Sequence, residues 1–554
     1  MVADPDAPEP IELNYAVAHE AVAAAVPDRP CILWGDRRFT WADVTDRTRR
    51  LAAVLGPGRI ADERTIDPWE SPHRHVALYL VNGNEYLEGM LGAWKARWAA
   101  VNVNYRYVTD ELVHVLGDAE VEAIVYHGRF AATLAEVLPR LPRTPRLLQV
   151  DDAGGAPLLP GATWYEAALA AATPEPPTGC SPDDRYIVYT GGTTGHPKGV
   201  LWRQADFIAT CLGVTDPVEA LAERAAAPDR QPLRALPAPP LMHGAAHWNA
   251  LSAWLAGGTV VFQQDPSRFD PVDLLDTCER HEATSLLIVG DAFARPLADE
   301  LRARPRHLPA LRHLVTGGAI LSPAVKAELL DHLPGLRIVD ILGSSETGRQ
   351  GVRSSGGSGP APSATFGRSA TTLVLSDDRT RELQPGDPEL GWLAQRGRVP
   401  LGYLHDRAKT EATFPVVGGE RMAVAGDRAR LTADGSIELH GRESGTVNSG
   451  GEKIFAEEVE LALKHHPSVY DVLVVGRPSE RWGQELVAVV ALRPGTDATD
   501  ATDEELRATC EPYLARYKWP KAFVRVDHVV RSPSGKPDYR WAREQVTAAA
   551  VDPG

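Results

Sequence analysis

Residues 189–199 combine glycine, threonine and lysine in a pattern that suits phosphate binding. The stretch reads Tyr-Thr-Gly-Gly-Thr-Thr-Gly-His-Pro-Lys-Gly. Glycines let backbone N–H groups come close to an anion, threonine hydroxyls add hydrogen-bond donors, and Lys198 adds a positive charge. A Walker A loop needs Ser or Thr after its lysine, whereas Gly199 stands there. We therefore expect a phosphate-binding loop of another class, with a Gly/Thr-rich surface turn as the alternative.

Two later stretches, each after a predicted strand, could extend this site. Residues 316–319 are Thr-Gly-Gly-Ala, and such small side chains let a flat ligand approach the backbone closely. Residues 343–348 are Gly-Ser-Ser-Glu-Thr-Gly, which places the carboxylate of Glu346 among hydroxyls and suits Mg²⁺ beside phosphates. Taken alone, each stretch is equally compatible with an ordinary loop.

Three charged residues further along the chain add to the pattern. Asp427 follows Ala-Gly in a tight turn, where its carboxylate could bind ribose hydroxyls or accept hydrogen bonds from its own backbone. Arg442 belongs to a Gly-Arg-Glu-Ser stretch that precedes Asn-Ser-Gly-Gly-Glu-Lys at 448–453. Lys536 ends the loop 532–536, Ser-Pro-Ser-Gly-Lys, although a lone lysine near a terminus is usually a solvated charge.

The elements that must position these residues alternate between strand and helix, which predicts a parallel α/β sheet. Two Gly/Pro-rich stretches differ: 154–182 predicts a linker, and 354–362 predicts a mobile segment. The expected strands lie at 76–81, 99–104, 123–126, 259–262, 285–289 and 311–315, and the expected helices at 86–97, 111–116, 205–211 and 245–256.

The sequence pattern changes after residue 437. Predicted helices at 457–464 and 504–517 accompany predicted strands at 469–475 and 485–492. We interpret this last part of the chain as a separate, small α+β domain.

Length, charge and cysteine use restrict the class of protein. The chain has 554 residues and a formal net charge of −16, which predicts several domains and argues against nucleic-acid and anionic-membrane partners. Its five cysteines form no Cys-x-x-Cys pair, so we expect reduced thiols. The first residues are acidic, and no apolar run reaches the roughly 20 residues that a membrane span needs. We therefore expect a cytoplasmic protein without a transmembrane segment.

Taken together and in this order, the segments resemble the acyl- and aryl-CoA synthetase superfamily of adenylate-forming enzymes. The resemblance covers about residues 14–545, and Glu346, Asp427, Arg442 and Lys536 stand where the family pattern has its charged residues. The stretches 101–107, 290–296 and 532–541 are similar to actinobacterial fatty-acyl-CoA ligases, especially those that activate steroid side-chain acids.

The resemblance implies an α/β fold with two domains. A large N-terminal domain, residues 1–441, would contain α/β subdomains with mainly parallel sheets and a distorted β-barrel. A hinge at 442–446 would connect it to a small, mobile α+β domain at 447–554. In this chain Ser444 stands at the hinge position, where the family usually has Asp or Lys.

The resemblance also implies a two-step reaction with ATP, Mg²⁺ and coenzyme A. A small-molecule carboxylic acid attacks the α-phosphate of ATP to give acyl-AMP and pyrophosphate, and the thiol of coenzyme A then displaces AMP. By this resemblance Lys536, Glu346 and Thr194 are catalytic, and Glu346 binds the metal. The residues implied for ATP or coenzyme A are Thr190, Gly191, Gly192, Thr193, Thr194, Gly195, Lys198, Gly317, Gly318, Ala319, Asp340, Ser345, Asp427, Arg442, Ser449, Gly450, Gly451 and Lys536.

The acyl pocket is expected to contain His243, Gly244, Trp248 and Phe293. For Trp248 and Phe293 ordinary core packing is the alternative. An apolar wall of this kind suits either a long chain or a flat fused-ring acid, so both remain open. Leu342 stands where many members have a tyrosine beside adenine, and stacking there must be weaker or come from elsewhere.

Two other functions remain open from the sequence. An acyl-AMP ligase could load a carrier protein in place of coenzyme A. A non-catalytic nucleotide sensor could have kept the fold, although the intact Lys198, Glu346, Asp427 and Lys536 argue against it. The oligomeric state is also open, a homodimer included.

Overall fold

A parallel five-stranded sheet contains the first half of the predicted strand–helix alternation. The computed structural model describes residues 11–191, 196–229, 231–356, 365–449, 452–496 and 501–551. Within these residues the sheet has the order β4-β3-β5-β6-β7. Its strands are β3 (His75–Tyr79), β4 (Ala99–Asn102), β5 (Ala123–His127), β6 (Arg146–Val150) and β7 (Ala162–Trp164), and its helices are α3 (Asn84–Lys95), α4 (Thr109–Asp118), α5 (Ala131–Val137) and α6 (Tyr165–Ala171).

The predicted linker at 154–182 is wrong in part, because β7 and α6 lie within it. The three-residue strand β7 is held by pairing with β6, and such a short edge strand leaves little trace in composition. Helix α6 has four alanines after Tyr165-Glu166, and alanine is the strongest helix former. Its Tyr165 and Leu169 are buried.

A second, longer sheet joins the middle of the chain to its beginning. Among the described residues it has thirteen strands in the order β17-β18-β22-β23-β16-β15-β14-β13-β12-β10-β11-β1-β2. The run from β14 to β1 is parallel, which confirms the predicted α/β class. These strands are β1 (Pro30–Trp34), β2 (Arg37–Thr40), β10 (Arg234–Pro237), β11 (Thr259–Phe262), β12 (Ser285–Ile288), β13 (His313–Gly317) and β14 (Arg337–Ser344).

Helices surround this parallel part of the long sheet. The predicted helix at 205–211 is divided into α7 and a π-helical turn at 208–212. The helices of this region are α1 (Tyr15–Ala25), α2 (Trp41–Leu55), α7 (Gln204–Phe207), α8 (Val218–Ala226), α9 (Gly244–Leu255), α10 (Pro271–Arg280), α11 (Gly290–Ala303) and α12 (Pro323–His332).

Antiparallel strands continue the long sheet beyond β14, and three others form a separate sheet in the order β19-β9-β8. The resemblance implied a distorted barrel in this region. Of the segment predicted to be mobile, Ser354 and Ser355 belong to β15, and 357–362 lie outside the described residues. The elements are β8 (Arg185–Thr190), β9 (Lys198–Arg203), β15 (Gly348–Ser355), β16 (Thr365–Arg368), β17 (Thr372–Leu375), β18 (Gly391–Gln395), β19 (Gly402–Tyr403), α13 (Arg407–Thr413), β20 (Val416–Val417), β21 (Glu420–Arg421), β22 (Asp427–Leu431) and β23 (Ile437–Arg442).

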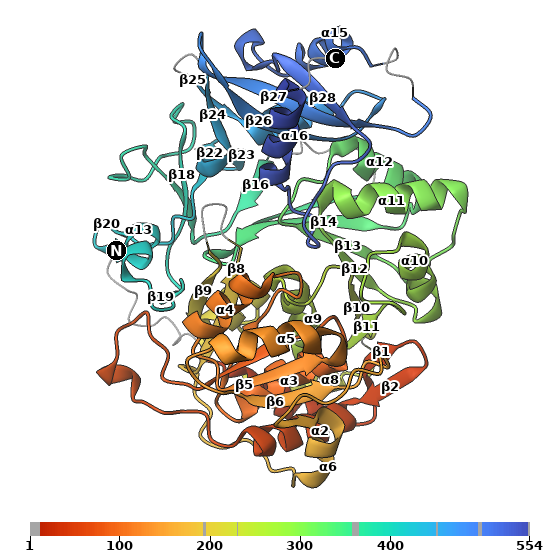
Figure 1. Cartoon of the computed structure of the whole chain (residues 1–554), viewed down its shortest axis with the longest axis vertical. Helices are drawn as coiled ribbons and strands as arrows, with labels where there is room; N and C mark the ends of the chain where they lie inside the picture. Colours follow the sequence, from red (N-terminus) through yellow and green to blue (C-terminus); the bar gives the residue numbers. More distant parts are fainter. Residues whose placement is uncertain are drawn as a thin grey trace.

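The C-terminal part has a sheet of its own and lies at the top of Figure 1, in blue. Within the described residues its strands have the order β25-β24-β27-β26, and β28 pairs with β27. The predicted helix at 504–517 ends at Cys510, because Pro512 follows and cannot donate a helical hydrogen bond. The elements are β24 (Thr446–Ser449), β25 (Glu452–Phe455), α14 (Ala456–Leu463), β26 (Val469–Ser479), β27 (Gly483–Leu492), α15 (Asp503–Cys510), β28 (Ala522–Val526) and α16 (Tyr539–Val551).

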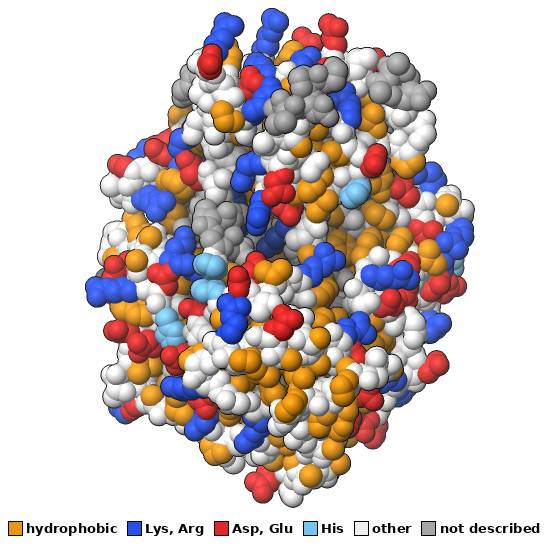
Figure 2. Space-filling model, viewed as in Figure 1, with side chains coloured by type: hydrophobic (Ala, Val, Ile, Leu, Met, Phe, Trp, Pro, Cys, Tyr) orange, Lys and Arg blue, Asp and Glu red, His pale blue; other side chains and the backbone are white. Residues whose placement is uncertain are grey.

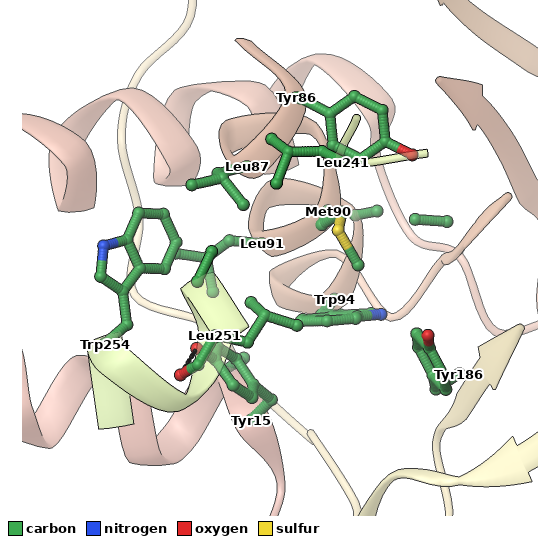
Figure 3. Packing of buried hydrophobic residues seen from close by; sticks show 14 of the residues in the cluster. Tyr15, Tyr86, Leu87, Met90, Leu91, Trp94, Tyr186, Leu241, Leu251 and Trp254 are labelled. Carbon is green, nitrogen blue, oxygen red and sulfur yellow. Dashed lines mark hydrogen bonds between the residues drawn. The ribbon is translucent and has the colours of Figure 1, made fainter. Parts of the chain in front are cut away.

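The largest hydrophobic cluster joins helices that are far apart in the sequence. Figure 3 shows Trp94 of α3 between Tyr15 of α1 and Tyr186 of β8. The Tyr15 hydroxyl donates a hydrogen bond of 2.8 Å to the carbonyl of Leu251 in α9. This core therefore binds the N-terminal helix to the strand that leads into the phosphate loop.

The described residues contain neither a membrane-spanning helix nor a disulfide bond. None of the helices there is long and apolar enough to cross a membrane. The five cysteines, all of them within the described ranges, are free thiols.

Two glycines in helices provide a matched test of core packing. A Cβ at Gly92 of α3 would lie 2.7 Å from Cδ2 of Leu51 in α2, whereas a Cβ at Gly117 of α4 would meet nothing within 4 Å. We expect Gly92→Ala to lower the free energy of unfolding by about 1–3 kcal/mol through overpacking. Gly117→Ala should raise it by about 0.4–1 kcal/mol because the unfolded chain loses entropy. Urea titrations followed by tryptophan fluorescence measure both, and equal effects would contradict the packing described here.

Candidate functional site

The loop that carries Lys536 reaches from the C-terminal part to the ends of β13 and β14. In Figure 1 this dark blue segment, between β28 and α16, descends toward the parallel sheet. The Cε atom of Lys536 lies 3.7 Å from where a Cβ would stand at Gly318. Gly318 has a φ of +79°, a conformation that L side chains rarely adopt. The backbone conformation therefore favours glycine at this position, and a Cβ there would be in ordinary van der Waals contact with Lys536.

Four charged side chains converge around this loop. Lys536 is exposed to solvent, although many protein atoms lie near its amino group. Burial lowers the pKa of Lys536, and the nearby Arg442 lowers it further, while Glu346 and Asp427 act in the opposite direction. Four of the charged residues predicted for the site are thus brought together by the fold.

Adjacent strands place Asp427 and Arg442 side by side. Asp427 begins β22, Arg442 ends β23, and the two residues are register partners. The Arg442 Nε donates to Asp427 Oδ1 over 3.1 Å. The side chain of Asp427 is mostly covered, whereas that of Arg442 is 45% exposed. The alternative for Asp427, a carboxylate that only caps its own turn, does not describe this pairing.

Two aromatic residues that the sequence did not reveal hold the acidic loop after β14. The Tyr403 hydroxyl donates a 3.0 Å hydrogen bond to Glu346 Oε1. The Trp202 Nε1 donates a 3.0 Å hydrogen bond to the carbonyl of Ser345. Trp202 lies in β9, directly after the phosphate loop, and β19 brings Tyr403 beside that strand. An aromatic donor so close to the glycine-rich stretch was the available signal for Trp202.

The phosphate loop is the connection of an antiparallel hairpin. Thr190 ends β8 and pairs with Lys198, the first residue of β9, and Gly191 is exposed. The Lys198 Nζ forms an ion pair with Asp406, whose other oxygen accepts a 2.9 Å hydrogen bond from the N–H of Lys409 at the start of α13. The residues Gly192, Thr193, Thr194 and Gly195 lie outside the described residues.

Asn102 joins the phosphate hairpin to the predicted acyl pocket. Its side-chain amide donates to the carbonyls of Tyr189 and Met242 over 2.9 and 2.7 Å, and its oxygen accepts from the N–H of Tyr189 over 2.7 Å. Tyr189 is the first residue of the glycine- and threonine-rich stretch 189–199, and Met242 precedes His243. One buried amide therefore couples the positions of both segments.

The small residues after β13 permit close approach of neighbouring backbone. A Cβ at Gly317 would lie 2.9 Å from the carbonyl oxygen of Ile341 in β14. The Thr316 hydroxyl accepts a 3.0 Å hydrogen bond from the N–H of Gly290, and Ala319 packs beside the same glycine. The stretch 316–319 is therefore shaped by contacts between strands as well as by any ligand.

The four predicted acyl-pocket residues lie in two groups. His243 and Gly244 begin α9, where Trp248 donates a 2.7 Å hydrogen bond to the Tyr186 hydroxyl. Phe293, on α11, is 3% exposed and packs against Phe269 and against Gly535 of the lysine loop.

A cavity of about 280 Å³ lies beside the lysine loop, and both Phe293 and Gly535 line it. Figure 2 shows this face of the molecule hollowed between the C-terminal part and the rest, with Lys and Arg side chains beside the hollow.

Three residues singled out from the sequence have side chains that are buried or paired within the protein. The carboxylate of Asp340 is buried and forms ion pairs with Lys326 and Arg353 at 2.7 and 2.9 Å, so only its backbone is available to a ligand. Leu342 packs in the hydrophobic cluster of the antiparallel strands. Ser449 is buried at the end of β24, while Gly450 and Gly451 lie outside the described residues.

His243 is a half-buried imidazole that resists protonation. Its Nε2 has no hydrogen-bond partner among the described residues. Burial lowers the pKa of His243 to about 3, with smaller contributions from the nearby Lys536 and His247. The imidazole is therefore neutral in the folded protein at neutral and mildly acidic pH.

This pKa predicts a stability change with pH. The unfolded chain takes up a proton near pH 6.5 and the folded protein only near the lowered value, so stability falls as the pH drops through this window. Between about pH 7 and about pH 4.5 the wild type should lose about 2–3 kcal/mol more than His243→Asn. His528→Asn, which replaces an exposed histidine, should follow the wild type. Urea titrations at both pH values measure the difference, and parallel losses in all three proteins would refute it.

Comparisons with known proteins agree with this geometry. A family model described as AMP-binding enzyme matches residues 19–404, and one described as AMP-binding enzyme C-terminal domain matches residues 458–536. The medium-chain acyl-CoA ligase Mig of Mycobacterium avium is 48% identical over 95% of this chain and 97% of its own. The 3-oxocholest-4-en-26-oate–CoA ligase of Rhodococcus rhodochrous is 38% identical over 98% of this chain and 97% of its own.

A solved structure has the same fold over almost the whole chain. The benzoate CoA ligase of Burkholderia xenovorans superposes with a TM-score of 0.78 at 20% identity, covering 96% of this chain and 100% of that one. The resemblance drawn from the sequence motifs is thereby confirmed. This chain belongs to the family of AMP-binding enzymes.

Proposed function

We propose that the protein is an ATP-dependent acyl-CoA ligase that converts a hydrophobic carboxylic acid, through acyl-AMP, to its coenzyme A thioester. The observation that carries the proposal is the convergence of Lys536 with Glu346, Asp427 and Arg442 beside Gly318. The printed names of the two relatives, an acyl-CoA ligase and a steroid-acid CoA ligase, support the same activity. ATP and coenzyme A as substrates are consistent with a cytoplasmic location.

The first step needs charge neutralisation more than covalent chemistry from the protein. The substrate carboxylate and the α-phosphate of ATP are both anionic, and a positioned cation between them lowers their repulsion as the new P–O bond forms. In our proposal Lys536 is that cation. The loop 190–198 with Lys198 holds the β- and γ-phosphates that leave as pyrophosphate, and Asp427 binds the ribose hydroxyls.

The adenine ring of ATP and the carboxylate of the substrate would lie beside the small residues of the site. We assign Gly317, Gly318 and Ala319, with the backbone of Asp340 and of Ser345, to the walls around adenine and the reacting carboxylate. His243, Gly244, Trp248 and Phe293 are the proposed contacts of the acyl group.

The residues present fit Mg²⁺ bound together with ATP. Mg²⁺ usually takes one or two protein carboxylates and completes its shell with substrate phosphates and water. Over the described parts of the chain no group of three or more metal-ligating side chains is found, so Glu346, held by Tyr403, would be the protein ligand. When bound there, Mg²⁺ would neutralise charge on the phosphates.

The second step requires a different arrangement of the two domains. In our proposal the N-terminal domain, residues 1–441, keeps the acyl-AMP while the domain at 447–554 rotates about the hinge 442–446. Rotation would withdraw Lys536 and turn Ser449, Gly450 and Gly451 toward the pantetheine of coenzyme A. Ser444 is exposed, as a hinge residue should be.

Lys536 provides the most direct test of the first step. We expect Lys536→Ala to lower acid-dependent ATP–pyrophosphate exchange by at least about 10²–10³-fold, because a preorganised charge is lost. Conversion of supplied acyl-AMP to the thioester should be retained. Lys521→Ala, at an exposed lysine of the same domain, should leave both half-reactions unchanged. Exchange at the wild-type rate in Lys536→Ala would show that the role given to this lysine is wrong.

A panel of acids separates the proposed substrates and the alternative functions. Release of AMP should be measured with fatty, aromatic and steroid side-chain acids, with and without coenzyme A. We expect turnover with hydrophobic acids that depends on coenzyme A. Turnover that is the same with and without coenzyme A would favour a ligase that loads a carrier protein. No turnover with any acid would favour a nucleotide sensor.

A further inference from the structure

Helix α11 presents a stripe of charges to the C-terminal part. Asp291, Arg295 and Asp299 follow one another at intervals of four residues, so they lie on one side of the helix. Asp291 Oδ2 is 3.1 Å from Lys464 Nζ, and Asp299 Oδ1 is 3.9 Å from Arg493 Nη1. Between them the guanidinium of Arg295 lies over the ring of Tyr470, 5.9 Å from its centre. Every member of the stripe thus faces a residue of the C-terminal part.

The Asp291–Lys464 ion pair is the buried end of this stripe. The two side chains are only 2% and 6% exposed. The N–H of Ser322 donates a 2.8 Å hydrogen bond to the second oxygen of Asp291, which fixes the carboxylate. Burial alone would raise the pKa of Asp291, but Lys464 and Arg295 hold this pKa below its ordinary value. A buried charge whose partner is removed is strongly unfavourable, so this contact is selective for the domain arrangement in which it forms.

A chain of charges leads from this pair to the catalytic loop. Lys464 is 3.7 Å from Asp471, which forms two hydrogen bonds of 2.7 and 2.8 Å with Arg531. The Arg531 Nη1 in turn donates a 3.3 Å hydrogen bond to the carbonyl of Gly535, the residue before Lys536. Arg531 also forms a β-bridge with Pro537, on the other side of Lys536. The loop that carries the lysine is therefore fixed at both ends by a residue linked to α11.

We infer that Asp291 and Lys464 are positioning residues for adenylation, forming with Asp471 and Arg531 a latch that holds Lys536 in the site. The inference rests on the proposed function and adds a residue pair to which that proposal assigns no contact with ATP or acid. Rotation of the C-terminal domain for the second step would separate Lys464 from Asp291. The latch therefore favours the first half-reaction and has to open for the second.

The test removes one charge of the latch at a time. Asp291→Asn keeps the shape and the acceptor for Ser322, and Lys464→Met keeps the aliphatic stem. We expect each variant to lower the kcat of ATP–pyrophosphate exchange by about 10- to 100-fold, because the lysine is misplaced, with little change in the KM for ATP. Thioester formation from supplied acyl-AMP should be equal to the wild type or faster. The double variant should lose no more than either single variant, since both remove the same contact.

A matched control lies two turns further along α11. The Asp299–Arg493 pair is about one-third exposed at each side chain and does not lead to the lysine loop. Asp299→Asn should therefore change neither half-reaction by more than about twofold, as for exposed ion pairs. If Asp291→Asn lost both half-reactions equally and had a lower melting temperature, the pair would have only a structural role. Unchanged exchange in both latch variants would also overturn the inference.

Limited cleavage by trypsin needs no turnover. It therefore shows whether the latch inference is wrong independently of whether the proposed function is wrong. Arg442 and Lys453, at the hinge and just after it, are 45% and 55% exposed, so trypsin can reach them when the domains move. Cleavage there should be faster in Asp291→Asn and Lys464→Met than in the wild type and Asp299→Asn. If the wild type activates no acid, the proposed function fails, while the cleavage rates still decide whether the pair holds the domains.

Discussion

The site depends on one electrostatic constraint, namely that two like charges, Lys536 and Arg442, must lie close to each other. Lys536 and Arg442 are both cations, so their approach is unfavourable, and the protein atoms around Lys536 add to this cost. The negative charges of Glu346 and Asp427 compensate. Each of these acids is also held by a neighbour, Tyr403 for Glu346 and Arg442 for Asp427. The charges therefore stabilise one another only as a set, and only while the C-terminal part is docked.

The fold supplies this set by bringing strand ends together. Gly317 ends β13, Glu346 follows β14, and Asp427 begins β22, so residues more than a hundred positions apart become neighbours. Ligand sites outside the carboxyl ends of parallel strands are a general property of α/β sheets. The C-terminal part adds what the sheet cannot supply, namely a cation that approaches from the opposite side.

The sequence predicted the charged residues of the proposed site better than the residues that hold them in place. Glycine-rich stretches and charged residues carry a chemical signal of their own, so Lys198, Glu346, Asp427 and Lys536 could be proposed for the site from the sequence. Tyr403 and Trp202 were missed, because the sequence does not tell whether an aromatic residue in a strand only packs or also donates a hydrogen bond. The carboxylate of Asp340 pairs with Lys326 and Arg353, contacts that only the packed sheet creates. Strand β7 depends likewise on its partner rather than on its own residues.

The ion pair between Lys198 and Asp406 has a consequence for which anions can enter. A carboxylate already occupies the place beside the lysine, so any incoming phosphate competes with a tethered ligand of the same charge sign. A single phosphate offers little more than the carboxylate it must displace. A polyphosphate carries more negative charge and would compete with the carboxylate more strongly. If Lys198 holds the phosphates of ATP as we propose, the Asp406 carboxylate is in place to pair with the lysine again when pyrophosphate departs, and Asp406 would then be its internal counter-ion.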